Sequence, residues 1–112
     1  MRALILFAPS PTVPGREQLT EDGRARLDSA MGPFIRYPRN TPFVIEGYAG
    51  GGTADVQFVL SRTRAQLVRD YLIAKFGLDA TYVGTMPMGA EAAESPSGER
   101  WEGVALAMFA PR

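Results

Sequence analysis

The chain has 112 residues, which is enough for one domain with a single hydrophobic core. Twelve basic side chains offset twelve acidic ones, so net charge recruits neither nucleic acid nor an anionic membrane. The absence of Cys and His excludes disulfides, thiolate or imidazole metal sites, and catalysis by a thiol or an imidazole.

The first part of the chain predicts a strand, a loop and a helix. Residues 3–7 form a short apolar run, which is typical of a strand covered on both faces. Three prolines between residues 9 and 14 predict a loop without regular structure through Gly15. Thr20 is the expected N-cap of a helix over residues 21–31, with two acidic residues in its first turn.

The second part predicts a strand, a long helix and two further strands, over residues 43–49, 54–76, 81–86 and 104–110. Thr53 is the expected N-cap of the long helix, and Gly77 its left-handed C-terminal cap. Its buried stripe should consist of small and apolar residues at helical spacing: Ser61, Ala65, Val68, Leu72 and Phe76. Residues 87–102 are rich in Gly, Ser, Glu and Pro and predict a loop.

Alternation of strands and helices favours right-handed crossovers onto one sheet. We therefore predict an α+β fold, a two-layer sandwich of order β-α-β-α-β-β with two helices packed on one face of a mixed sheet. The direction of the last strand stays open, because a long loop instead of a helix precedes it. We expect a single domain over residues 1–112. Its opening apolar run is too short for a signal peptide or a membrane span, so the domain was either cut from a longer protein or is cytoplasmic.

Three glycines, Gly50 to Gly52, separate the second strand from the long helix. The first turn of a helix has unpaired N–H groups and a partial positive charge, and glycines let an anion approach them closely. A nucleotide is disfavoured, because no Lys-Ser or Lys-Thr follows the glycines and their spacing does not fit Gly-x-Gly-x-x-Gly. The segment thus indicates a local anion site without a nucleotide.

The long helix carries a family signature. The run Leu60-Ser61-Arg62-Thr63-Arg64-Ala65, followed by Val68 and Leu72, resembles the helix of OmpA-like, peptidoglycan-binding C-terminal domains. The run Ile45-Glu46-Gly47-Tyr48 resembles the strand that leads into the binding loop of that family. Looser matches extend the resemblance over nearly the whole chain.

The resemblance implies a non-catalytic module of the periplasm or outer membrane that binds the diaminopimelate residue of the peptidoglycan stem peptide, without cofactor or metal. In the family, an Asp after the second strand holds the ligand's ammonium, and the signature Arg, here Arg64, holds its carboxylate. The candidate ligand-binding residues lie in the loop and at the start of the helix: Tyr48, Gly50, Gly51, Gly52, Thr53, Asp55, Gln57 and Arg64.

The chain departs from the family at this site. Tyr48-Ala49-Gly50 stands where the family has a His-Thr-Asp-like triplet, and Gln57 replaces the usual Asn. Trp101-Glu102-Gly103 stands where Asn-Arg-Arg is common. Loss of the charge-assisted bond to the ammonium, worth ~1.5–3 kcal/mol, should weaken binding ~10- to 100-fold. Asp55 either substitutes for the missing carboxylate or only complements the helix dipole.

Two functions stay open. The first is a cell-wall module that binds the stem peptide weakly or in an altered way through Arg64. The second is an OmpA-like fold that has lost this ligand and serves as a protein-interaction or scaffold domain of an envelope or transport assembly. The partner is peptidoglycan in the first case and an envelope protein in the second, and neither case involves nucleic acid or direct membrane insertion by this chain. Glu46 is expected to form a salt bridge with an Arg of the long helix.

Overall fold

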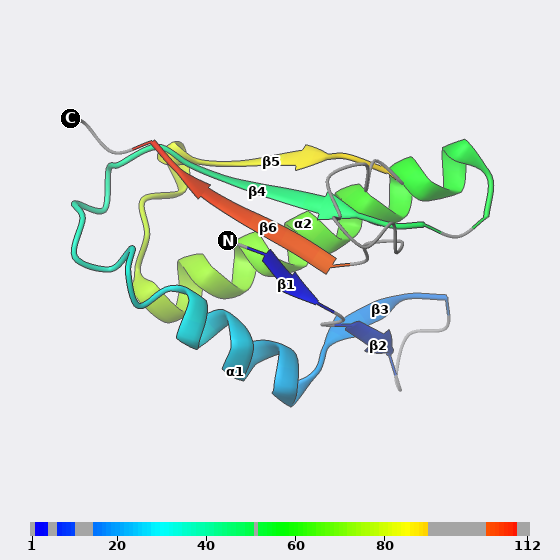
Figure 1. Ribbon diagram of the computed structural model, residues 1–112, viewed down its shortest axis with the longest axis horizontal. Helices are drawn as coiled ribbons and strands as arrows, with labels where there is room; N and C mark the ends of the chain where they lie inside the picture. The colour runs from blue at the N-terminus through cyan, green and yellow to red at the C-terminus, as the bar shows by residue number, and fades with distance from the viewer. Residues whose placement is uncertain (1, 5–6, 11–14, 51, 90–102, 110–112) are drawn as a thin grey trace.

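The computed structural model describes residues 2–4, 7–10, 15–50, 52–89 and 103–109. They form a four-stranded mixed sheet with two helices on one face, and a separate two-stranded ribbon (Figure 1). The predicted α+β class with two helices on one face of a mixed sheet is confirmed. The elements in chain order are β1 Arg2–Leu4, β2 Phe7–Pro9, β3 Glu17–Leu19, α1 Glu21–Ala30, β4 Phe43–Tyr48, α2 Ala54–Phe76, the 3₁₀ turn η1 Ala80–Tyr82, β5 Val83–Pro87 and β6 Gly103–Met108.

The sheet has the strand order β1-β6-β4-β5. Strand β4 pairs in parallel with β5 and antiparallel with β6, so that Ile45 lies between Thr85 and Leu106. Strand β1 pairs antiparallel with the other edge of β6. The direction of the last strand, which the sequence left open, is therefore antiparallel to both of its neighbours.

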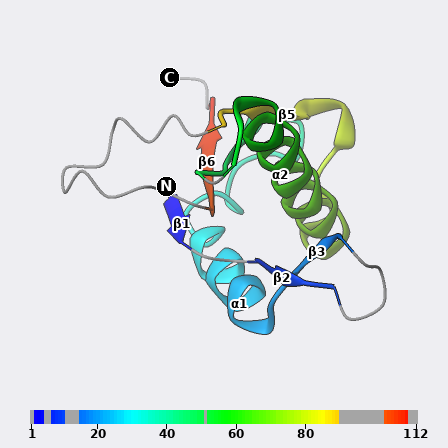
Figure 2. The same ribbon diagram turned by 90° about the vertical axis from the view of Figure 1, so that its right-hand side faces the viewer.

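The N-terminal region differs from the prediction of one strand over residues 3–7 followed by a loop. Strand β1 lies in the main sheet, whereas Phe7 begins β2, which pairs with β3 as a ribbon of two short strands. Pro9 ends β2 opposite Glu17, where a proline is tolerated because the ribbon has no further strand for it to pair with. Figure 2 shows the ribbon apart from the main sheet, on the side where the helices lie.

Both helices begin at their predicted N-caps, and α2 ends at its predicted C-terminal cap, whereas α1 ends at Ala30, one residue before its predicted end. Thr20 Oγ1 accepts a hydrogen bond from Gly23 N at 2.8 Å, and Thr53 Oγ1 accepts one from Val56 N at 3.3 Å. Gly77 closes α2 with a φ of 64°, and its N–H donates to Ile73 O at 2.9 Å. Among the described residues, no helix combines the length and the apolar character needed to cross a membrane.

The core lies between the sheet and the helices. The predicted stripe of α2 is fully buried at Ser61, Ala65, Val68 and Leu72 and partly buried at Phe76. It packs against inward-facing side chains of the central strands: Phe43, Ile45, Val104 and Leu106. This packing fixes the start of α2 over the end of β4, where the candidate site lies.

Candidate functional site

The site is built on a close contact between the end of β4 and the second and third turns of α2. A Cβ placed on Gly47 would lie 1.9 Å from the carbonyl oxygen of Ser61 and 3.1 Å from the Ala65 methyl group. The fully buried Ser61 hydroxyl donates to Phe58 O and accepts a hydrogen bond from Gly89 N at 3.1 Å. Gly47 and Ser61 therefore hold strand, helix and the turn after β5 together.

The glycine loop is fastened to the first turns of α2. Gln57 Nε2 donates to Gly52 O at 3.2 Å and more weakly to Gly50 O at 3.5 Å. Gly52 has a φ of 79°, which a residue with a side chain adopts only with strain. Gly51 lies outside the described residues. The side-chain amide nitrogen of Gln57 is thus already hydrogen-bonded to the loop.

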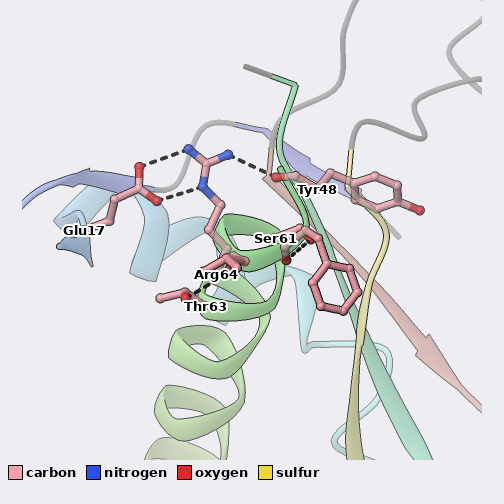
Figure 3. Close-up of polar contacts among 7 residues, drawn as sticks. Glu17, Tyr48, Ser61, Thr63 and Arg64 are labelled. Carbon is pink, nitrogen blue, oxygen red and sulfur yellow. Dashed lines mark hydrogen bonds and ion pairs between the residues drawn. The ribbon is translucent and has the colours of Figure 1, made fainter. Parts of the chain in front are cut away.

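The guanidinium of Arg64 is the centre of the site and already holds a carboxylate (Figure 3). Its Nε and Nη2 donate to the two carboxylate oxygens of Glu17 at 2.8 and 2.9 Å, and its Nη1 donates to the carbonyl oxygen of Tyr48 at 3.0 Å. Arg64 is only 8% exposed. The bidentate pair neutralises a buried charge in the geometry that guanidinium and carboxylate prefer.

The ribbon supplies both a carboxylate and an aromatic ring to this guanidinium. Glu17 belongs to β3, and the ring of Phe7, on the paired strand β2, has its centroid 5.3 Å from the central carbon of the Arg64 guanidinium. Sequence reasoning missed Glu17, which is separated from Arg64 by 47 positions. No periodicity over a three-residue strand could have pointed to it.

Tyr48 takes part through its backbone and not through its ring. Side chains alternate along a strand, so Tyr48 and Glu46 lie on the sheet face opposite the helices. The ring packs with Ala105 and Met88, and Figure 3 shows it pointing away from the guanidinium. Its hydroxyl donates to Glu46 Oε1 at 3.4 Å. The expected salt bridge between Glu46 and helix α2 is therefore wrong, because alternation puts this carboxylate on the other face.

Asp55 and Thr53 lie at the exposed start of α2. Asp55 makes no salt bridge within the described part of the chain, and it lines a surface pocket of about 600 Å³. The pocket is open to solvent between α2 and β3, and its lining is partly apolar: Gly15, Arg16, Glu17, Asp55, Val56, Val59, Leu60 and Thr63. No group of three acidic side chains among the described residues is placed to hold a metal ion. The structure therefore brings Arg64 and the Tyr48 carbonyl together, and leaves Asp55 on the outer rim.

Comparison with known proteins decides the family. The OmpA family model matches residues 13–100. The chain belongs to the OmpA family. Several solved OmpA-like structures share its fold. The C-terminal domain of MotB from Helicobacter pylori superposes with a TM-score of 0.68 at 12% identity, over 95% of this chain and 84% of that one.

Two further solved structures share this fold. The OmpA-like domain of FopA1 from Francisella tularensis has a TM-score of 0.56 at 25% identity, over 81% of this chain and 65% of that one. The peptidoglycan-associated lipoprotein from Burkholderia pseudomallei has a TM-score of 0.59 at 16% identity, over 81% and 79% of the two chains. No curated protein sequence matches the chain.

Three positions of the OmpA signature in α2 have a clear structural role. Ser61 ties the helix to the turn at Gly89, and Ala65 is small enough to pass under Gly47. Arg64 leaves the same helix toward the ribbon and holds Glu17. In this OmpA-family domain the signature therefore maintains the packing of the fold, independently of any bound ligand.

Proposed function

We propose that this OmpA-family domain is a non-catalytic module of the cell envelope that acts through contacts with other proteins. The proposal rests on one observation: the fork of Arg64, the group that would grip a stem-peptide carboxylate, is filled by the carboxylate of Glu17. An intramolecular partner competes at a high effective concentration, on the order of millimolar or more for a short connection. A free stem peptide would have to compete with Glu17 for the Arg64 guanidinium and would bind more weakly.

The glycine loop between β4 and α2 offers no acidic side chain that would strengthen binding of the stem peptide. A zwitterionic ligand needs an acid for its ammonium, and the chain has Gly50 where the family has an Asp. Placement in the envelope is supported by relatives. The Helicobacter pylori MotB structure is of a periplasmic domain, and the Burkholderia protein is a peptidoglycan-associated lipoprotein.

A second candidate function is weak binding of the diaminopimelate stem peptide in an altered mode. It is favoured by the position of Arg64 in the signature and by the Glu17 side chain, which is 23% exposed and lines the surface pocket. In this mode the ligand's carboxylate would displace Glu17 from the guanidinium.

A titration separates the two candidates. Isotope-labelled protein is titrated with a diaminopimelate-containing muropeptide, and the amides of Gly50 and of residues 52–56 are followed by NMR. We expect no saturable shifts at millimolar ligand, because Glu17 keeps the guanidinium. Saturable shifts that are lost in Arg64→Ala but kept in Arg62→Ala would contradict this and establish stem-peptide binding. Arg62 is the matched control, since it is exposed and lies two positions away on the same helix.

A further inference from the structure

A second pocket lies toward the C-terminal end of α2, away from Arg64 (Figure 1). It has a volume of about 320 Å³ and lies between the loop that precedes β4, the last turn of α2 and the adjoining ends of β5 and β6. Lys75, which lines it, is about 16 Å beyond Arg64 along the helix axis. We call it the Arg39 pocket. It shares no lining residue with the surface pocket beside Glu17.

The apolar part of the lining suits an aromatic group. It includes three phenylalanines and three aliphatic or thioether side chains: Phe34, Phe43, Phe76, Leu78, Val83 and Met108. The rings of Phe34 and Phe43 meet edge to face, with centroids 5.6 Å apart and planes at 84°. A further ring placed in the pocket would gain contacts of the same kind, because aromatic rings favour this arrangement.

The charged part of the lining is basic. Arg39 and Lys75 line the pocket, and none of its described lining residues is acidic. Lys75 Nζ lies 3.5 Å from the carboxylate of Asp28, whereas the Arg39 guanidinium forms no hydrogen bond or ion pair with a described residue. Its Nη1 lies beside Gly77, where the partial negative charge of the end of α2 attracts a cation. The donors of Arg39 can therefore bind an anion.

A buried hydroxyl without a partner lies beside this cation. Thr41 lines the pocket and is only 6% exposed. Its N–H donates to Pro38 O at 3.0 Å, but its hydroxyl makes no hydrogen bond with a described residue. Buried hydroxyls nearly always have a partner, because leaving one unpaired costs free energy. A polar atom of a bound molecule would supply that partner.

We propose that the Arg39 pocket binds a carboxylate carried on a small aromatic group. The ring packs among the phenylalanines, the carboxylate pairs with the Arg39 guanidinium, and the Thr41 hydroxyl donates to a carboxylate oxygen. The volume lies at the lower end of the range for small-molecule sites, which is about 300–1,000 Å³. This site uses neither Arg64 nor the glycine loop, so it goes beyond the proposed function and does not depend on it.

Titration with 3-phenylpropionate tests the proposal. Isotope-labelled full chain is titrated at constant ionic strength and followed by NMR. We expect saturable shifts of the Arg39, Thr41 and Gly77 amides, with those of Gly50 and Val56 unchanged. The absence of saturable shifts at millimolar ligand would overturn the proposal. Saturable shifts confined to Gly50 and Val56 would also overturn it, because they would place the carboxylate at the start of α2.

Two further compounds separate the contributions of charge and ring. The neutral amide 3-phenylpropionamide should bind about tenfold more weakly or worse, since it lacks the charge-assisted pair with Arg39. Propionate keeps the carboxylate and lacks the ring, so it should give no saturable shifts at the same concentrations. Equal affinities of the acid and its amide, or of 3-phenylpropionate and propionate, would contradict the proposed ligand class.

Arg39→Gln tests the cation and has a matched control. Arg39 is exposed, so its replacement should leave the fold intact, which far-ultraviolet circular dichroism verifies. We expect Arg39→Gln to weaken binding of 3-phenylpropionate about tenfold or more. Arg62→Gln makes the same change in net charge at an exposed position of α2 outside the pocket, and it should bind as wild type. Equal affinities of the two variants would overturn the role of Arg39.

Thr41→Val separates a ligand contact from a structural one. It replaces the hydroxyl by a methyl group of similar size, so without ligand it should melt no lower than wild type. Its affinity for 3-phenylpropionate should fall about 2- to 10-fold, the worth of one hydrogen bond. A lower melting temperature without ligand would show that the fold itself uses the hydroxyl. That result, or an unchanged affinity, would overturn the role given to Thr41.

Discussion

Gly47 sets how closely the sheet and helix α2 approach each other. A methyl group there would lie 1.9 Å from the Ser61 carbonyl oxygen, and both partners are backbone that cannot move aside alone. We expect Gly47→Ala to lower the free energy of unfolding by about 2–4 kcal/mol, as overpacking of a rigid contact does. Urea denaturation measures the loss. Gly84→Ala is the control, since a Cβ at Gly84 meets nothing within 4 Å.

Gly84→Ala should change stability by no more than about 0.5 kcal/mol. Equal effects of the two substitutions would contradict the role given to Gly47. The comparison is well matched, because Gly47 and Gly84 lie on the neighbouring parallel strands β4 and β5.

Single residues differ in how far sequence could place them. Arg64 could be singled out from the sequence, since its position in the helix signature is specific, and its role in ligand binding stays a prediction. Tyr48 was placed among the candidate ligand-binding residues, although strand alternation turns its ring to the face opposite Ile45 and Gly47, which face the helices. Glu17 was out of reach of any local pattern, because its contact with Arg64 is made only after the ribbon has folded against α2.

Among the elements, α2 was predicted with its observed bounds, and its C-terminal cap allows a direct test. Gly77 has a φ of 64°, and a Cβ there would lie 3.5 Å from the Arg39 guanidinium, an ordinary contact. The cost of Gly77→Ala should therefore be conformational and about 1–2 kcal/mol. Gly77→Asn should cost less, because Asn adopts the left-handed conformation more readily. Thermal melts followed by circular dichroism give both values, and an equal loss in both variants would contradict the assignment.

The short strands show where prediction from sequence fails at the level of elements. Long helices can be predicted from sequence because apolar residues recur over many turns and because capping residues such as Thr53 and Gly77 mark their ends. The three-residue strands β1, β2 and β3 have no period to read, and their pairing is decided by distant partners. One apolar run over residues 3–7 therefore looked like one strand, although its two ends serve two different sheets. The predicted loop over residues 87–102 lies mostly outside the described residues.

At the scale of the whole molecule, the two helices are linked by a pair of contacts that depends on pH. The Tyr71 hydroxyl on α2 donates to Asp28 Oδ1 on α1 at 2.6 Å, and Lys75 Nζ lies 3.5 Å from the same carboxylate. Burial, the hydrogen bond to Asp28 and its negative charge raise the pKa of Tyr71 from 10.0 to about 12. The folded protein thus holds this proton more tightly than the unfolded chain does.

The pKa of Tyr71 gives the sign of the pH dependence. The stabilisation is fully present below about pH 10, the pKa of an unfolded tyrosine, and is lost as the pH rises toward about 12. We expect Tyr71→Phe to be less stable than wild type near neutral pH by about 0.5–1.5 kcal/mol, the worth of one hydrogen bond. The difference should shrink between pH 10 and 12. Urea denaturation across this range measures it.

Tyr82→Phe provides the comparison for that experiment, since Tyr82 is 41% exposed and its hydroxyl donates no hydrogen bond among the described residues. Its difference from wild type should stay constant with pH. A constant difference for Tyr71→Phe as well would contradict the raised pKa.

The place of β6 in the sheet has a consequence for the order in which the chain can fold. Strand β6 lies between β1 and β4, and Arg2 pairs with Ala105. During synthesis β1 emerges first but finds its only partner in the main sheet in the strand that emerges last. Until then the central strand β4 has β5 alone. Completion of the sheet must therefore wait until β6 has left the ribosome, and it depends on contacts between distant positions, which slows folding.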